Sequence, residues 1–443
     1  MKKETLIQII VIIILAIILA IFINKTISLD NQKPNDMKNG KKQMQGSSSN
    51  VESSGATEVT DEQTLTGEYE TSNEDESVIK VSDGGNLTLD GATVSKTGGD
   101  SSNTENSEFY GVNSGVLTTE NSTTTIKNAT ISTNAKGANA VFARGENAKV
   151  YVSDTTITTT GESSSRGLDA TYGGYIEAEN VNISTQGGSC ATLATDRGEG
   201  TVIAKNSTLA TAGSGSPIIY STGDITLEDS SGIATGAQIT VVEGKNSATI
   251  KNSTVVASGK GNRNDVDNCA VMIYQSMSGD ASEGTGAFSA TDSLLEIGEN
   301  SDYYKTAPFF FITNTDAVIN LENTTLKYGS NVLISCKGTD EWGNSGNNGG
   351  NVTLNAKSQT LVGDVEADEL SEVEINLEEK SSFEGTINGQ NSAKSIKLKL
   401  DSNSKIKLTG DSYISELDDE DENYSNIDLN GYKLYVNGKE ISK

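Results

Sequence analysis

Residues 149–159 read KVYVSDTTITT, and residues 175–185 read YIEAENVNIST, 26 positions further along the chain. In both segments apolar and polar residues alternate up to a single Asp154 or Asn180, and a short second run with an isoleucine follows. Successive side chains of a β-strand point to opposite faces, so this alternation predicts two short strands that meet at the Asp or Asn corner. A unit of this kind that recurs at a steady spacing predicts a solenoid.

The corner residue recurs over most of the chain. The corners are Asp90, Asn128, Asp154, Asn180, Asn206, Asp229, Asn252, Asp292 and Asn323. Steps of 23 to 26 residues fit one coil of three strands, and the longer steps of 31 to 40 residues fit the same coil with an inserted loop. We expect these insertions at residues 99–113, 259–268, 276–286 and 337–350.

Apolar columns accompany the corners. Two residues before the corner stand Ile126, Val152, Ala178, Ala204, Leu227, Ile250, Ala290 and Leu321. Three residues after it stand Ile131, Ile157, Ile183, Leu209, Val255, Leu295 and Leu326. Asp90 and Asp229 are each followed by one extra residue. The apolar residue therefore falls four positions after the corner, at Val94 and Ile233. These columns predict ladders of side chains stacked inside the solenoid.

Third strands complete the coils. Apolar runs at residues 140–143, 191–194, 217–220, 270–273 and 309–312 precede Gly-containing turns. Three strands per coil predict a right-handed parallel β-helix of about a dozen coils over residues 64–443, ending in a C-terminal cap that covers unpaired backbone. We interpret the Asn/Asp column as structural corners, because these residues tolerate a left-handed backbone and stacked amides can bond from coil to coil. A row of metal ligands is the alternative.

The N-terminus predicts a membrane anchor. Lys2 and Lys3 precede an apolar run at residues 6–23 that is interrupted only by Gln8. This run is long enough to cross a bilayer as a helix, and no small-residue cleavage pattern follows it. We therefore predict a transmembrane signal-anchor at residues 1–23, with a cleaved signal peptide as the alternative. Residues 24–63 are polar and predict a disordered linker. The protein is then a single-pass protein of the cell membrane with most of the chain extracytoplasmic.

Composition excludes several functions. The formal net charge is -28, which argues against nucleic acid as a partner, because phosphate binding needs clustered Lys and Arg. The sequence contains no His, so Ser-His-Asp catalysis and His-ligated zinc are excluded. Its three cysteines, Cys190, Cys269 and Cys336, lie far apart and are interpreted as small core residues.

The ladders resemble the right-handed parallel β-helix superfamily, whose members include polysaccharide lyases and surface adhesins. The segments VMIYQSMSGD at residues 271–280 and WGNSG at residues 342–346 are similar to adhesin-like, largely uncharacterised surface proteins of Gram-positive bacteria. That resemblance implies a role at the cell surface and provides no catalytic residues.

One candidate site follows from charged residues in neighbouring coils. β-Helix lyases use calcium held by carboxylates and an Arg or Lys base, and this chain offers Arg144, Arg166, Asp169, Asp196 and Arg197. A turn with solvated charges is the alternative. We assign these residues to ligand binding and none to catalysis; no metal ligands are assigned, although bound calcium stays open.

Aromatic residues give a second candidate. Tyr172 adjoins a Gly-Gly turn, and Trp342 lies in a Gly- and Asn-rich loop in which we expect it to be exposed and able to stack on a sugar. A threonine column at Thr133, Thr159, Thr185, Thr211 and Thr235 is expected on a solvated outer face.

Together these features favour an adhesin-like or glycan-binding surface protein. Its partner would be an extracellular polysaccharide or a host or neighbouring cell surface. The alternatives are a polysaccharide lyase or hydrolase acting on acidic glycans, and a structural spacer.

Overall fold

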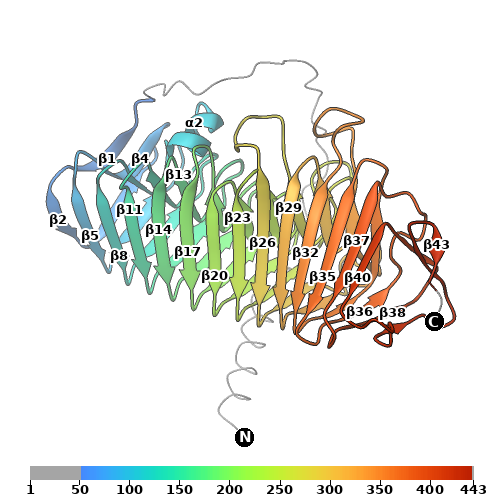
Figure 1. Cartoon of the computed structure of the whole chain (residues 1–443). Helices are drawn as coiled ribbons and strands as arrows, with labels where there is room; N and C mark the ends of the chain where they lie inside the picture. The colour runs from blue at the N-terminus through green and yellow to red at the C-terminus, as the bar shows by residue number, and fades with distance from the viewer. Residues whose placement is uncertain (1–50, 442–443) are drawn as a thin grey trace, which may run out of the picture. The chain divides into compact units, whose positions relative to one another are not determined.

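A computed structural model describes residues 51–441, which coil into a solenoid of parallel strands (Figure 1). Three sheets run along the solenoid, and each coil adds one strand to each of them until the C-terminal coils. The prediction of a three-strand parallel β-helix of about a dozen coils is confirmed. Its right-handed sense stays a prediction, which rests on the general rule for parallel crossovers.

Sheet A has 12 strands. They are β1 (Ser54–Val59), β4 (Glu76–Val81), β7 (Val116–Thr118), β10 (Val141–Arg144), β13 (Leu168–Thr171), β16 (Leu193–Thr195), β19 (Ile219–Ser221), β22 (Thr240–Glu243), β25 (Val271–Tyr274), β28 (Phe310–Thr313), β31 (Val332–Cys336) and β34 (Asp364–Ala367).

Sheet B has 14 strands. They are β2 (Glu62–Leu65), β5 (Asn86–Asp90), β8 (Thr123–Lys127), β11 (Lys149–Ser153), β14 (Gly174–Glu179), β17 (Gly200–Lys205), β20 (Asp224–Glu228), β23 (Ser247–Lys251), β26 (Thr285–Thr291), β29 (Asp316–Glu322), β32 (Asn351–Lys357), β35 (Glu372–Glu378), β37 (Ser395–Leu400) and β40 (Glu416–Asp419).

Sheet C has 10 strands, and four-stranded sheet D follows it in the C-terminal coils. Sheet C contains β3 (Glu68–Thr71), β6 (Thr93–Lys96), β9 (Thr130–Thr133), β12 (Thr156–Thr159), β15 (Asn182–Thr185), β18 (Thr208–Thr211), β21 (Ser231–Ala234), β24 (Thr254–Ala257), β27 (Leu294–Ile297) and β30 (Thr325–Lys327). Sheet D contains β33 (Thr360–Val362), β36 (Ser382–Gly385), β38 (Lys405–Leu408) and β41 (Ile427–Asp428).

The C-terminal end closes with a small sheet of β39 (Ser412–Ile414), β42 (Leu434–Val436) and β43 (Lys439–Glu440). β43 pairs with β42 in the antiparallel direction, which ends the parallel stacking. At the other end, the strands begin earlier than predicted. β1 starts at Ser54, inside the predicted linker, because parallel pairing with β4 orders a segment whose small polar residues show no apolar periodicity.

The predicted transmembrane helix at residues 1–23 lies outside the described residues, as does most of the predicted linker. Within residues 51–441 the chain forms one helix, α2 (Thr104–Tyr110), and no helix there is long and apolar enough to span a membrane.

The Asn/Asp corners are confirmed as structural. All but Asp90 adopt a left-handed backbone, with φ between 44° and 54°; at that coil Gly91 takes the conformation instead. Their side chains bond between coils: the Asn128 amide donates to Asp90 at 3.0 Å and the Asn180 amide to Asp154 at 2.6 Å. Such a ladder satisfies the exposed corners and fixes the register of successive coils.

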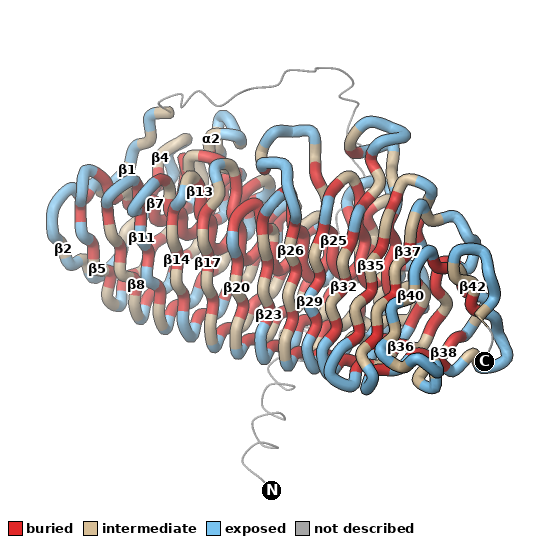
Figure 2. Tube along the Cα trace, in the orientation of Figure 1, coloured by how far each residue is buried: buried red, intermediate tan, exposed pale blue. Residues whose placement is uncertain are grey.

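The predicted inward columns are buried along the solenoid, as Figure 2 shows. Two residues depart from this: Leu326 is only half-buried, and Ile233 does not point inward. It pairs with Ala210 on the half-buried face, while Gly232 occupies the inward position beside Leu209. A Cβ at Gly232 would lie 3.3 Å from both Ile218 and Val255, so neighbouring side chains already fill that space. The inward residue thus falls three positions after Asp229, as it does at most other corners, and the expected extra residue is not present.

The threonine column also differs from the expectation of a solvated face, because most of it lies inside the solenoid. Thr133, Thr159, Thr185 and Thr211 are buried, and only Thr235 is exposed. The hydroxyl of Thr133 donates to the Ala138 carbonyl at 2.7 Å, and other members bond to the loop that follows in the same way. These threonines lie two residues after the inward isoleucines, so strand parity already placed them inside.

The cysteines are core residues, as predicted. All three are free and buried. Burial raises the pKa of the Cys190 thiol to about 11 and that of Cys336 to about 12. Because the thiolate is the reactive form, these side chains are unreactive at neutral pH.

Replacing an inward residue tests the core. Ile157→Ala should lower the free energy of unfolding by about 2–5 kcal/mol, because Ile157 stacks between Ile131 and Ile183 and the cavity cannot collapse. Thr158→Ala, on the opposite face of the same strand, should change it by less than about 0.5 kcal/mol. Denaturant titration of the purified chain, followed by circular dichroism, makes the comparison. Equal effects would contradict the assigned faces.

Candidate functional site

The four predicted insertions all adjoin sheet A. Residues 99–113, with α2, precede β7, and residues 259–268 precede β25; residues 276–286 follow β25, and residues 337–350 follow β31. Figure 1 shows α2 and the long loops rising on the same side of the solenoid. Outward residues of sheet A beneath these loops, such as Phe142 and Asp169, are buried, so this part of the sheet is covered on both faces.

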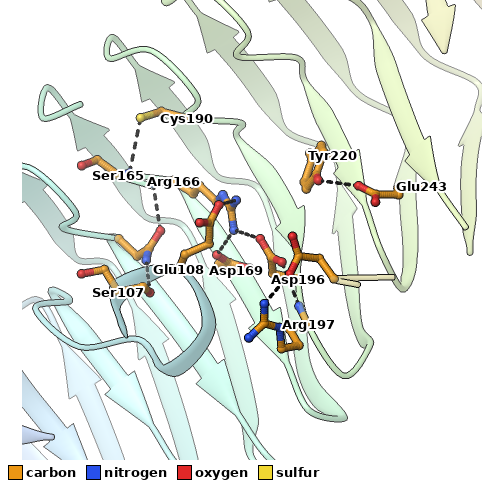
Figure 3. Close-up of polar contacts among 12 residues, drawn as sticks. Ser107, Glu108, Ser165, Arg166, Asp169, Cys190, Asp196, Arg197, Tyr220 and Glu243 are labelled. Carbon is orange, nitrogen blue, oxygen red and sulfur yellow. Dashed lines mark hydrogen bonds and ion pairs between the residues drawn. The ribbon is translucent and has the colours of Figure 1, made fainter. Parts of the chain in front are cut away.

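A buried ion cluster lies between α2 and sheet A (Figure 3). Arg166, two residues before β13 begins, places Nη1 2.8 Å from Asp169 Oδ2 and 2.7 Å from Asp196 Oδ2. Its Nη2 lies 2.7 Å from Oε1 of Glu108 on α2. One guanidinium thus joins the helix to two neighbouring coils.

Burial determines what this cluster can do. Arg166 is only 4 % exposed. Burial raises the pKa of Asp169 and, more strongly, of Asp196, although Arg166 opposes both shifts. The three carboxylates raise the pKa of Arg166 against the effect of burial, so it stays protonated. Arg166, Asp169 and Asp196 are therefore buried, and their ion pairs join α2 to sheet A.

Arg144 and Arg197 lie at the end of α2. The Arg197 guanidinium lies 3.8 Å from the Phe109 ring centre and pairs with Asp280 of the loop at residues 276–286. Arg144 donates to the Tyr110 carbonyl at 3.3 Å, and its Nη2 lies 3.7 Å from Glu120. Arg197 therefore joins α2 and the loop at residues 276–286 to the coils of the solenoid, and Arg144 contacts the last residue of α2.

Tyr172 stacks on Tyr110 of α2, with ring centres 5.6 Å apart. Its backbone is left-handed, with φ of 51°, which is uncommon for a bulky residue. Together with Arg144 it lines an open groove of about 990 Å³. Arg144 and Tyr172 thus line this groove, whereas Arg166, Asp169 and Asp196 belong to the buried cluster.

Trp342 is not the exposed loop residue that was expected. It is 6 % exposed, and its ring meets Tyr274 edge-on at 5.2 Å between centres. It packs with Val241, Met272 and Phe311 on the outer face of sheet A. The loop at residues 337–350 folds back over the sheet, which its Gly- and Asn-rich sequence does not reveal.

The folded loops border a partly open pocket of about 240 Å³, which we call the sheet A pocket. Its apolar floor includes Val241 and Met272. Its aromatic residues are Tyr220, Tyr274 and Trp342. Its polar lining comprises Glu108, Arg166, Ser189, Gln238, Asn262, Arg263 and Asp267.

A buried carboxylate fixes two of the aromatic rings. The hydroxyls of Tyr220 and Tyr274 donate to Glu243 Oε2 at 3.0 and 2.9 Å. Burial raises the pKa of Glu243, and burial together with this carboxylate raises the pKa of both tyrosines. The phenols therefore stay protonated, and the rings are held in place before any ligand arrives.

Gln238, Glu243, Arg263 and Asp267 are not among the site residues predicted from the sequence. One signal was available: the strand register aligns Ala194, Tyr220, Val241, Met272 and Phe311 in a single outward column. An apolar column on an outer face indicates that something covers it. Calcium stays untested; among the described residues no group of three or more His, Cys, Asp or Glu side chains could hold a metal ion.

No family model matches the chain, and neither the curated proteins nor the solved structures compared with it give a match.

The ion cluster predicts a pH dependence. A carboxylate whose pKa is raised by folding stabilises the fold at pH below its unfolded value, near 3.8, and that contribution is lost as the pH rises through the raised value. Asparagine does not titrate, so the Asp196→Asn variant lacks this pH-dependent loss. Its stability relative to the native chain should therefore increase as the pH rises from 4 to 8. Thermal melts across this range measure the difference. Asp340→Asn changes an exposed aspartate outside the cluster and serves as the control; a trend shared by both variants would contradict the assignment.

Arg166→Met tests the contribution of the cation to the cluster. The substitution leaves buried carboxylates without their cation and should destabilise the chain by about 3–5 kcal/mol at neutral pH. Part of this loss should be recovered in acid, where the carboxylates are protonated. Denaturant titrations at pH 7 and pH 4.5 test both statements; a loss below 1 kcal/mol at pH 7 would show that the cluster is not structural.

Proposed function

We propose that this chain is a membrane-anchored, extracytoplasmic β-helix of adhesin-like type that binds glycan in the sheet A pocket. The observation that carries the proposal is the combination of aromatic walls, an apolar floor and a polar lining in one pocket.

The chemistry of the pocket suits a sugar ring. A sugar presents C–H faces that pack on aromatic rings and hydroxyl groups that need hydrogen-bond partners. Trp342 and Tyr274 offer the first kind of contact, while Gln238, Asn262 and Asp267 offer the second. The volume of about 240 Å³ is smaller than typical drug-sized sites of about 300–1,000 Å³, so it favours one sugar unit or the end of a chain.

Binding without chemistry is favoured over a lyase or hydrolase. A lyase needs a basic group to remove a proton, and such a group works best with a pKa near the working pH. Arg166 is surrounded by carboxylates, and the raised pKa values of Tyr220 and Tyr274 make them poor bases.

The surface location rests on sequence. The apolar run at residues 6–23 suits a membrane anchor, and the polar residues after it suit a stalk. A β-helix on such a stalk would carry the loops around sheet A away from the membrane, where they could meet an extracellular polysaccharide or another cell's surface.

Glycan binding can be tested directly. The detergent-purified full-length chain should bind members of a glycan array. Trp342→Ala should weaken binding to those glycans at least tenfold, because the main aromatic wall is lost, while Trp342→Phe should retain part of it. Calorimetric titration gives the ratios.

The control is Tyr432→Ala, which removes an exposed aromatic side chain at the C-terminal end and should leave binding unchanged. Absence of any glycan binding, or equal affinity in the Trp342→Ala variant, would overturn the proposal.

A further inference from the structure

The charges that line the sheet A pocket are nearly all engaged within the protein. Glu108 and Arg166 pair with each other, and Arg166 holds two more carboxylates. Asp267 accepts backbone N–H groups from Asn262 at 3.2 Å and from Arg263 at 3.0 Å. The remaining charged group is the guanidinium of Arg263.

Arg263 differs from the other arginines. The sequence contains four, and Arg144, Arg166 and Arg197 each pair with a carboxylate. Arg263 is exposed, and within residues 51–441 its side chain forms no ion pair and no side-chain hydrogen bond. Its five N–H donors are therefore available at the pocket.

The backbone beneath this side chain is fixed. The Arg263 N–H donates to Asp267, and its carbonyl accepts the N–H of Val266 at 3.0 Å. The Asn268 side chain accepts the N–H of Gly261 and thereby closes the base of the same loop. A guanidinium on an ordered turn loses less freedom on binding than one on a loose loop, so its contribution to affinity is larger.

We infer that the sheet A pocket selects an anionic sugar, with Arg263 binding an oxyanion group of the ligand, in the simplest case a carboxylate. This inference rests on the proposed glycan binding and adds the class of glycan. A planar guanidinium matches a carboxylate through two parallel hydrogen bonds, and such charge-assisted bonds are stronger than neutral ones.

The net charge of -28 does not prevent this selection. At physiological ionic strength the screening length is about 8 Å, so distant surface carboxylates contribute little. Close to the ligand, the carboxylates of Glu108 and Asp267 already have donors of their own.

Matched neutral and acidic probes test the inference. Methyl glycosides of glucose, galactose and mannose are titrated by calorimetry into the full-length chain beside the corresponding glucuronide, galacturonide and mannuronide. For at least one pair, the acidic member should bind at least tenfold more tightly. Arg263→Gln should reduce that ratio to about one while leaving affinity for the neutral member within twofold. Lys305→Gln removes an exposed positive charge that does not line the pocket, and it should leave the ratio unchanged.

The outcomes separate the two proposals. If none of the six glycosides binds, glycan binding in this pocket is refuted, and the selection falls with it. If both members of each bound pair bind equally, glycan binding stands and the anionic selection is refuted. If Arg263→Gln weakens both members of a pair to the same degree, Arg263 supports the pocket and does not select the charge.

Discussion

Parallel stacking of every coil on the one before it is the constraint on which the rest of this protein depends. Each strand bonds to the strand one coil away, so equivalent residues lie directly above one another. An inward residue must therefore suit its neighbours in two coils, as Ile157 does between Ile131 and Ile183. The corner column obeys the same rule, because one amide bonds to the carboxylate of the preceding coil.

This constraint also decides where variation can occur. An extra residue within a strand would move its inward side chains to the other face, so additional chain is tolerated between strands. In this molecule the long insertions lie at the two ends of sheet A strands, and they fold over the outer face of that sheet. The sheet A pocket exists because loops from different coils meet there.

The segments that cover the outer face of sheet A are held to the coils by buried or partly buried ion pairs. Arg166 holds α2 to the coils through Glu108, Asp169 and Asp196, and Arg197 holds a second loop through Asp280. Burying such charges is costly unless every partner is present, so the cluster provides specificity of placement more than net stability. Arg263, on the same side of the solenoid, lacks such a partner among the described residues.

The coil architecture was predictable from sequence because period-two alternation and the corner spacing are local signals that recur many times. The errors arose where a single residue breaks the pattern: Gly232 occupies an inward position that apolar counting assigned to Ile233. Thr133, Thr159, Thr185 and Thr211 lie inside although their side chains are polar, because the alternation of the strand decides which face a residue occupies.

The candidate site was less predictable for a physical reason. Its residues come together because loops fold back over sheet A, and the sequences of these loops have no periodic pattern. Trp342 therefore looked exposed, and Arg166 looked available for a ligand, although both are buried. Their surroundings depend on contacts between coils that are far apart in sequence, and a single sequence carries no direct signal for such contacts.

Cross-linking between coils tests the stacked register most directly. Thr158 and Ser184 are register partners on neighbouring strands of sheet C, whereas Asn182 lies two residues away from that partner position. The pair Thr158→Cys with Ser184→Cys should be joined efficiently by a short thiol-specific cross-linker, and Thr158→Cys with Asn182→Cys should be joined poorly. The buried native cysteines should not compete. Equal yields from the two pairs, or a higher yield from the offset pair, would contradict the 26-residue stacking on which this account rests.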